Sequence, residues 1–511
     1  MTIELIGIIT IVCGLLILRL GPDFGIYALM IATLLGAAAA VKLPMLGGAN
    51  ILPAHALLPF YALAVAKLPR GVDNAIRSLA YPGPGFWFTA FVVYGVVSAL
   101  FLPRLFAGTI DVFSIARDVT GRGGGTYMTS LSPGSGNITQ SVYLVGNLVI
   151  FMAVMAHAAS GALSTVVRAV VAAAAMNLMF AVADLATYAA SIPEAMDFIR
   201  NANYGLLTES DISGYKRIVG SFTEASAFGG ITLVYFAFCF ELWLRGVYPR
   251  VCGLVAALLL LAALASTSSS TYVGLGIYAT VVLLRCAAGL ITGRTTLRAT
   301  AVAFVVPAGA VLVVLTLALI PSVWTSLSDL VDRTLLNKLQ TQSGIERALW
   351  NEHALRVFYE SFGLGAGVGS VRASSFLVAV LANTGLIGLL FLGAMLISLA
   401  CFVVRGASDG RADGYIAAGG WACFALLLSA SLTASSVDLG LLFFINAAIV
   451  TAAARLSARS GRECLYDQKA AALLGRGRDD VQSSPMRISS WNVRPMQLGT
   501  DVYKGADIWT R

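Results

Sequence analysis

Charged residues are scarce in this chain, and their scarcity excludes most classes of soluble protein. Only 12% of the 511 residues are Asp, Glu, Lys or Arg, whereas 58% are hydrophobic. Soluble domains carry charge on about a quarter of their residues. The mean hydropathy of +0.83 and many long apolar runs indicate an integral membrane protein. Because lipid offers the backbone no hydrogen-bond partners, we expect an all-α, polytopic transmembrane helical bundle.

Metal-binding and disulfide patterns are also missing. The chain has three histidines, and its seven cysteines form no Cys-x-x-Cys pair and follow no regular spacing. All cysteines except Cys464 lie within or beside apolar runs, so we expect small buried hydrophobic side chains. Since no Walker, His-x-x-x-His or Ser-His-Asp arrangement stands out either, we expect no metal and no cofactor. Much of the formal charge of +8 lies in the C-terminal tail, which suits the cytoplasmic side of a membrane and does not indicate a nucleic-acid partner.

Thirteen apolar runs predict membrane spans, within an expected total of about 12–14. Their expected bounds are 3–20, 24–41, 51–66, 86–102, 138–157, 163–183, 226–244, 251–265, 272–288, 299–320, 374–404, 415–435 and 437–454. Residues 1–455 then form the membrane domain. Residues 456–511 contain no apolar run, and we interpret them as a poorly ordered cytoplasmic tail.

Basic residues near the span ends predict the orientation of the bundle. They occupy alternate connections, which should therefore be cytoplasmic: Arg245 and Arg250; Arg285, Arg294 and Arg298; Arg405 and Arg411; Arg455, Arg459 and Arg462. The long loops near 184–225 and 321–373 then lie on the opposite side. The Gly- and Ser-rich stretch 117–137 falls on that side too, and we expect it to be mobile.

The stretch 343–388 is the longest polar-rich interruption of the apolar sequence. Its first part predicts an amphipathic helix, in which Arg347 falls in the middle of the apolar face with Asn351 beside it. A guanidinium turned toward the protein is costly unless an anion meets it. Arg347 is therefore a candidate anion ligand. His353 falls on the polar face, where we expect it to be solvated.

Alternating glycines, Gly363 to Gly369, connect this helix to Arg372 and the next span. No strand precedes them, so they favour a tight backbone turn over a nucleotide-binding loop. Ser374 and Ser375 can cap the helix 374–404, and a helix N-terminus beside an arginine is a suitable anion site. The alternative is that Arg372 only extends its charge toward water from the end of a span.

A second polar stretch, 215–224, precedes the span that starts near residue 226. It carries Lys216 and Arg217, and basic residues on the outer side oppose the usual charge bias of membrane proteins. Glu224 has two interpretations, because it can accept a proton in catalysis or complete a capping box with Ser221.

The remaining polar residues give weaker signals. The run 266–271 of Ser and Thr can bind sugar or phosphate, but it is equally typical of a polar hairpin, which we favour slightly. We interpret His55 and His157, isolated in or beside apolar segments, as structural. Asp184 and Asp438 border spans and can either cap them or line a cavity.

Taken in order, these motifs resemble those of the bacterial O-antigen ligase and polysaccharide polymerase family. The resemblance covers residues 200–400. It is carried by Arg217 with Gly220 to Glu224, Ser266 to Thr271, Arg347 with Trp350, Gly363 to Gly369, and Asn383 to Gly388.

The resemblance implies a metal-independent glycosyltransferase of the bacterial inner membrane, with its active site facing the periplasm. Its substrate would be an undecaprenyl-diphosphate-linked oligosaccharide. Membrane lipid, a flippase and a chain-length regulator are the implied partners. The resemblance implies that Arg217, Arg347 and Arg372 hold the diphosphate in catalysis, and Glu224 is our candidate catalytic base. The candidate substrate-binding residues are Lys216, Trp350, Asn351, Ser374 and Ser375.

One departure from the family pattern favours polymerisation. Ligases of this family usually carry a His-Asn pair where this chain has Ser374-Ser375. We therefore expect a polymerase that joins lipid-linked repeat units, with the arginines stabilising the leaving diphosphate. Ligase-like transfer to another acceptor and non-enzymatic transport of lipid-linked sugars stay open as alternatives. Transport predicts charges deep within several spans, whereas the charges here gather in loops.

Overall fold

A computed structural model shows a multi-pass bundle of helices. It describes residues 2–43, 49–117, 123–202, 211–212, 215–293, 295–319, 342–407 and 409–458. Eight helices within these ranges are long and apolar enough to cross a membrane, when the continuous stretch Ser135–Ala189, which contains α6 and α7, is counted once. Four further apolar helices are shorter. The expected all-α, polytopic membrane fold is confirmed. The expected tail beyond residue 458 and the loop 320–341 lie outside the described residues.

Each of the thirteen expected spans coincides with an apolar helix. In chain order the helices are α1 (Leu5–Leu20), α2 (Pro22–Ala32), α3 (Pro53–Ala66), α5 (Pro84–Leu105), α6 (Ser135–His157), α7 (Leu163–Ala189), α8 (Ala225–Leu244), α9 (Pro249–Ala265), α10 (Ser269–Ile291), α11 (Leu297–Ala318), α14 (Phe376–Arg405), α15 (Gly410–Thr433) and Gly440–Ala458. Proline opens α2, α3, α5 and α9, where its missing N–H costs no helical hydrogen bond.

Four further helical segments and three small antiparallel sheets complete the described structure. The segments are α4 (Gly71–Arg77), the π-turn η2 (Ala158–Ala162) between α6 and α7, the 3-10 turn η3 (Pro193–Ile199) and α13 (Gln342–Glu360). The sheets are β1 (Thr2–Ile3) with β2 (Val41–Leu43) and β3 (Ala49–Ile51), β4 (Asp111–Arg117) with β5 (Gly123–Ser130), and β6 (Asp211–Ile212) with β7 (Tyr215–Lys216). In β4–β5 the register pairs Asp111 with Ser130.

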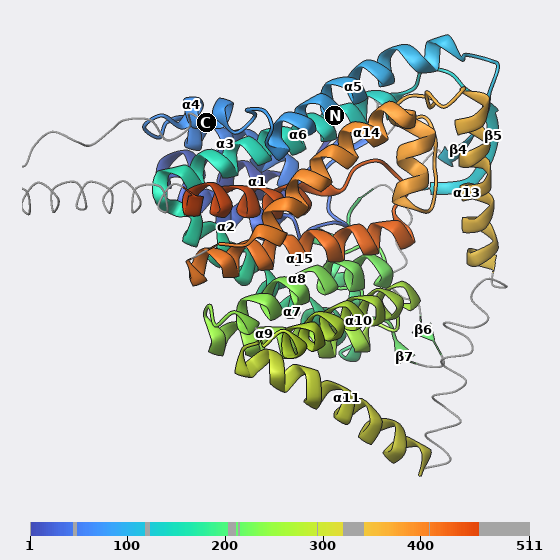
Figure 1. The fold of residues 1–511 in the computed structure, drawn as a ribbon. Coiled ribbons are helices and arrows are strands. Elements are labelled where there is room, and N and C mark those ends of the chain that lie inside the picture. Colours follow the sequence, from blue (N-terminus) through green and yellow to red (C-terminus); the bar gives the residue numbers. More distant parts are fainter. Residues whose placement is uncertain are drawn as a thin grey trace, which may run out of the picture.

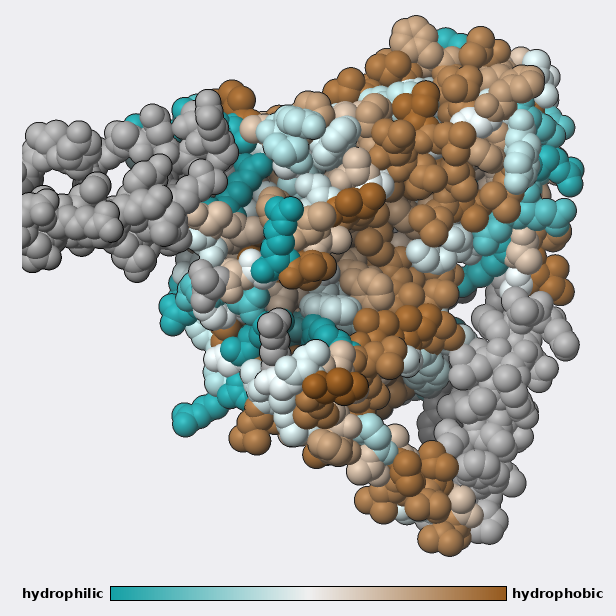
Figure 2. Space-filling view, in the orientation of Figure 1, coloured by the Kyte–Doolittle hydropathy of each residue, from teal (hydrophilic) through white to brown (hydrophobic). Residues whose placement is uncertain are grey.

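The two ends of the bundle differ from its middle. Figure 1 shows α13, β4 and β5 at one end and α4 at the opposite end. Hydrophobic side chains cover much of the middle of the face in Figure 2, whereas hydrophilic groups gather at the two ends. An apolar belt between polar ends is the surface that a bilayer requires of a spanning protein.

The end that carries α13 has a small core of its own. Ala354 and Val357 of α13 pack with Val112 of β4 and with Val371 and Ala382 near α14, and all five are buried. The expected mobility of the stretch 117–137 stays a prediction, but much of the described part of this stretch is regular secondary structure. Residues 123–130 form strand β5, and 135–137 begin α6.

The second expected span, 24–41, is helical only in its first part. Helix α2 ends at Ala32, and the chain then turns irregularly, although Leu34 and Ala37 to Ala40 stay buried. The Ser221 carbonyl accepts from the Ala37 N–H, and Asn201 Oδ1 accepts from the Ala39 N–H. Irregular backbone is tolerated at membrane depth only where protein groups satisfy it in this way.

Candidate functional site

The glycine turn after α13 is fixed by one side chain of α14. Asn383 Oδ1 accepts from the N–H groups of Ser370 and Val371, and its Nδ2 donates to the Val371 and Ala379 carbonyls. A Cβ on Gly365 would lie 2.7 Å from the Asn383 carbonyl carbon, so the backbones touch. The expectation of a tight turn is confirmed, since all four alternating glycines have positive φ.

This turn presents Arg372 just before α14. The Arg372 guanidinium carbon lies 4.4 Å from the centre of the Trp350 ring on α13, in a cation–π contact. Asn351 Oδ1 accepts from the Ser374 N–H at 2.7 Å. Trp350, Asn351 and Ser374 thus hold the arginine and its loop together. Ser375 is the N-cap residue of α14, but its side chain makes no capping hydrogen bond.

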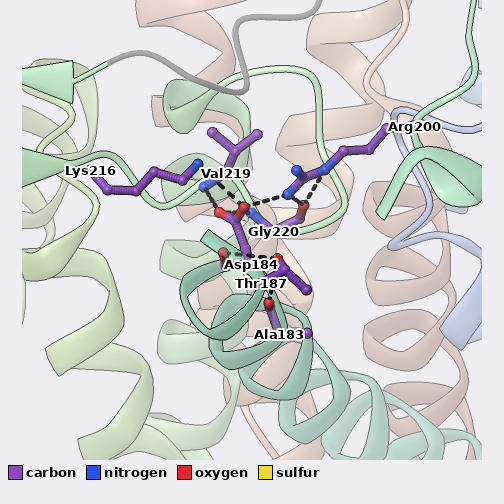
Figure 3. A network of polar contacts seen from close by, with 7 residues as sticks. All are labelled: Ala183, Asp184, Thr187, Arg200, Lys216, Val219 and Gly220. Atoms are coloured by element: carbon purple, nitrogen blue, oxygen red, sulfur yellow. Dashed lines mark hydrogen bonds and ion pairs between the residues drawn. The ribbon is translucent and has the colours of Figure 1, made fainter. Parts of the chain in front are cut away.

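A buried carboxylate on α7 fixes the turn that follows Arg217 (Figure 3). Asp184 Oδ2 accepts from the N–H groups of Val219 and Gly220 at 2.8 and 3.1 Å. Arg200 reaches Asp184 Oδ1 at 2.7 Å and also donates to the Gly220 carbonyl. The side chains of Asp184 and Arg200 are only 1% and 5% exposed. In low dielectric such a paired, fully bonded charge holds its geometry firmly.

Lys216, a predicted substrate ligand, lies in the same cluster. Its Nζ is 3.3 Å from Asp184 Oδ1, and its side chain is 8% exposed. It also lies 5.2 Å from the centre of the Tyr188 ring. The structure therefore places Lys216 in the ion cluster that holds the turn in Figure 3, in contact with Asp184.

Glu224 does not form the capping box that competed with its catalytic role. It is the N-cap residue of α8, and its side chain accepts no backbone N–H there. The Ser221 hydroxyl donates instead to the Leu34 carbonyl at 2.7 Å. The Glu224 carboxylate accepts from the Ser226 hydroxyl. Its electrostatic influence reaches Arg217 and Arg372.

The structure brings the four predicted catalytic residues into one electrostatic cluster. Burial lowers the pKa of Arg217; Glu224 opposes this shift, and the positive charge of Arg347 lowers the pKa further. The pKa of Arg372 is lowered for the same reasons, with burial first and the same two neighbours acting. A guanidinium stays protonated in spite of such shifts. Glu224 and Arg347 thus act electrostatically on both Arg217 and Arg372, although these residues come from segments that are distant in the sequence.

None of the three guanidinium groups is paired with a carboxylate of the part of the chain that the structure describes. Arg347 is half-buried on α13, as its position on the apolar face predicts. Within the described residues none of the three forms an ion pair, and the buried Nε atoms of Arg217 and Arg372 have no hydrogen-bond partner. Since buried charge without a partner is costly, this arrangement favours an anionic ligand.

A cavity of about 480 Å³ opens beside Arg372. Hydroxyl, amide and backbone groups line much of it, including Ser132, Gln140, Ser370 and Ser436. Arg217, Glu224 and Arg347 are not among its lining residues. Asn137, which also lines it, donates to the Val368 carbonyl and the Ser370 hydroxyl at 2.8 Å. The cavity therefore offers polar partners next to the cationic cluster.

Two weaker sequence interpretations can now be judged. The run 266–271 forms the expected hairpin between α9 and α10, in which the hydroxyls of Ser268 and Ser270 contact each other at 3.1 Å. His353 is buried, so the expectation of a solvated side chain is wrong. Its Nε2 lies 2.8 Å from the Asp111 carbonyl, and its ring packs on Phe113. Strand β4 covers the helix face that a helical wheel shows as polar.

Sequence reasoning missed the residues that position the site. In the sequence, Asp184 was interpreted only as an acidic residue that borders a span. No neighbouring residue indicates that it binds a turn 35 residues later. Asn137 and Tyr272 were not singled out, although Tyr272 acts electrostatically on Arg217. The one available signal was that Asp184 is an acid in an apolar segment, which usually requires a buried partner.

A scan of the chain against models of known protein families finds no match, and a search of curated proteins finds no relative. The fold and the site define a multi-pass membrane protein with a partly buried cationic cluster at one end. The family resemblance of its motifs is taken up as a proposal below.

Proposed function

We propose that this protein is an inner-membrane polysaccharide polymerase. It joins undecaprenyl-diphosphate-linked oligosaccharide repeat units at the periplasmic face, without a metal. The observation that carries the proposal is that Arg217, Arg347 and Arg372 are all half-buried and form no ion pair with any residue that the structure describes. Glu224 acts electrostatically on Arg217 and Arg372. Guanidinium groups bind phosphate oxygens in pairs and keep their charge, which suits a diphosphate ligand.

In the proposed reaction, a sugar hydroxyl of one repeat unit attacks the anomeric carbon of another. The bond between that carbon and the diphosphate oxygen breaks, and undecaprenyl diphosphate leaves with the bonding electron pair. Fixed cations stabilise the charge that develops on the leaving oxygen. Glu224 accepts the proton of the attacking hydroxyl, a contribution worth about 10²–10⁴-fold in rate. No nucleotide is needed, since the diphosphate ester is already activated.

Replacement of Arg347 tests the proposal. Arg347→Ala is expected to fold and insert normally, to abolish polymer and to accumulate lipid-linked single repeat units, measured by glycan profiling of the producing strain. Arg347→Lys is expected to fail largely as well, because a point charge does not reproduce the planar pair of donors.

The matched control is Arg356→Ala on the same helix. Arg356 is 60% exposed and lies 3.7 Å from Glu352, so its loss is expected to leave polymer length unchanged. Polymer of normal length in Arg347→Ala would sink the proposal. Equal loss in both variants would point to a general defect of α13 and would also count against it.

Transport of lipid-linked sugars is the second candidate, and one observation favours it. Glu241 of α8 is fully buried and pairs with Arg285 of α10, which stacks on Trp421 of α15. A charged pair between spans is a feature of transporters. Purified protein in liposomes separates the two functions. The polymerase lengthens glycans, whereas a transporter moves labelled lipid-linked sugar between leaflets without lengthening them.

A further inference from the structure

A second cavity of about 440 Å³ lies inside the bundle. Its walls come from α2, α3, α6, α8, α15 and the segment 434–442. Apolar side chains such as Val234, Leu426 and Leu442 line part of it. The polar residues that line it are Thr33, His55, Gln140, Tyr143, Ser226, Ser429, Thr433, Ser436 and Asp438. This is the mixture of apolar wall and convergent polar groups that small-molecule sites show.

Two of these polar groups have no hydrogen-bond partner among the residues that the structure describes. Both ring nitrogens of His55 are buried, and neither hydrogen-bonds to any residue that the structure describes. The same holds for Gln140 Oε1. The His55 ring lies 4.6 Å from the Tyr143 ring, so its orientation is fixed by packing. Buried donors and acceptors without partners are costly, and a ligand that supplies both would satisfy them.

The charge of the cavity indicates what kind of ligand it takes. Among its lining residues there is no Lys or Arg, and the one charged group is Asp438. Asn147 and the Gly440 N–H both donate to Asp438 Oδ1, whereas its Oδ2 bonds to no described residue. A carboxylate repels a phosphate and accepts from a hydroxyl. The cavity therefore suits a neutral ligand that carries hydroxyl groups.

The second cavity adjoins the cationic cluster. Gln140 and Ser436 line both this cavity and the one beside Arg372. Ser226, which also lines the second cavity, donates its hydroxyl hydrogen to Glu224. Glu224, the proposed proton acceptor, thus lies one hydrogen bond away from a residue that lines the second cavity.

We propose that this cavity is the binding site for the acceptor sugar, with His55, Gln140 and Asp438 as its hydrogen-bonding groups. The inference rests on the proposed polymerase function. It assigns the donor and the acceptor to two neighbouring sites of different chemistry. The diphosphate of the donor lies among the arginines, and the hydroxyl-bearing end of the acceptor lies in the cation-free cavity. His55 binds the acceptor here and takes no part in bond breaking.

Binding to the full-length protein in lipid nanodiscs tests the inference with two compounds. The first is the free repeat-unit oligosaccharide, released from its lipid by mild acid, and the second is farnesyl diphosphate, which carries no sugar. His55→Ala and Gln140→Leu are each expected to weaken oligosaccharide binding about tenfold, the effect of one lost hydrogen bond. Farnesyl diphosphate affinity should stay within about twofold in His55→Ala, since His55 does not line the cavity beside Arg372. Arg347→Ala is expected to weaken farnesyl diphosphate binding and to leave oligosaccharide affinity unchanged.

Each outcome decides between the claims. Unchanged oligosaccharide affinity in Gln140→Leu, which nearly keeps the side-chain shape, overturns the acceptor site. A loss of farnesyl diphosphate affinity in stably folded His55→Ala overturns it as well. If His55→Ala lowers the unfolding midpoint, Gln140→Leu alone decides. If wild-type protein does not bind farnesyl diphosphate, or Arg347→Ala binds it as wild type does, the proposed function fails independently.

Discussion

Asp184 is the residue on which the position of Arg217 depends most directly. Its two oxygens bind the Val219 and Gly220 N–H groups, Arg200 and Lys216, so it fixes the chain immediately after the arginine. In the sequence, Lys216 was a candidate substrate-binding residue and its neighbour Arg217 a candidate catalytic one. The structure instead shows that adjacent basic residues have different environments, since Lys216 pairs with Asp184 and Arg217 forms no ion pair among the described residues.

Replacement of Asp184 by Asn is expected to lower the free energy of unfolding by about 3 kcal/mol, because it leaves Arg200 and Lys216 without their buried counter-charge. Farnesyl diphosphate affinity should fall as well in the folded fraction, since the turn that positions Arg217 loosens. Thermal unfolding and binding in nanodiscs measure the two effects.

Asp73→Asn is the control for this variant. Asp73 pairs with Arg77 four residues later on α4, where the two side chains are 48% and 30% exposed. An exposed pair of this kind contributes less than about 1 kcal/mol. Wild-type stability in Asp184→Asn, or an equal effect in both variants, would contradict the role given to Asp184.

Helix α14 is interrupted where it meets the glycine turn. Gly385 has φ +60° and ψ −160° within the helix, and the Leu386 N–H bonds to the Gly363 carbonyl instead of continuing the helical pattern. The interruption lies two residues after Asn383, which binds the turn that carries Arg372. Breaks in spanning helices are tolerated where other protein groups satisfy the backbone, and they frequently mark binding sites.

Gly385→Ala is expected to destabilise the protein and to abolish polymer. The added Cβ would lie 2.2 Å from the Gly363 carbonyl oxygen, and the positive φ disfavours any L side chain. The loss in free energy of unfolding should exceed about 1 kcal/mol, measured by thermal unfolding.

Gly393→Ala provides a matched comparison within the same helix. A Cβ at Gly393 meets no atom within 4 Å, and the change should leave stability unchanged or raise it slightly. If both alanine variants behave alike, the interruption at Gly385 has no special role in the fold.

At the scale of the whole molecule, α13 and α4 lie at opposite ends of the bundle (Figure 1). The proposed orientation places α13 in the periplasm. A cysteine at Glu352, which is 69% exposed, should therefore react with a membrane-impermeant maleimide in intact spheroplasts. A cysteine at Asp73 should react only after the membrane is permeabilised, and wild-type protein supplies the background labelling. The reverse pattern would invert the orientation and remove the periplasmic site.

The helices were predictable from the sequence because long apolar runs in lipid have few structural alternatives to a helix. The end of α2 at Ala32 was not predictable. The backbone of the segment that follows it forms hydrogen bonds with Ser221 and Asn201, which lie far along the chain. The prediction of a solvated His353 failed for a similar reason. A helical wheel contains no information about strand β4, which covers the polar face of α13.

The site was predicted in part. Arg347 was identified because a charge on an apolar face requires an explanation, and its half-buried position agrees with that reasoning. The placement of Arg217 and Arg372 depends on distant backbone N–H groups that donate hydrogen bonds to Asp184 and Asn383. Such long-range contacts leave no local pattern in one sequence.

The glycine turn also determines how often random missense mutations inactivate this protein. Near-contact of backbones at Gly365, Gly369 and Gly385 leaves no room for a Cβ. Every single-nucleotide change that alters the amino acid at a glycine codon adds one. If the protein is the proposed polymerase, a random screen for cells that lose their surface polymer should therefore collect missense alleles at these positions as often as at the arginines.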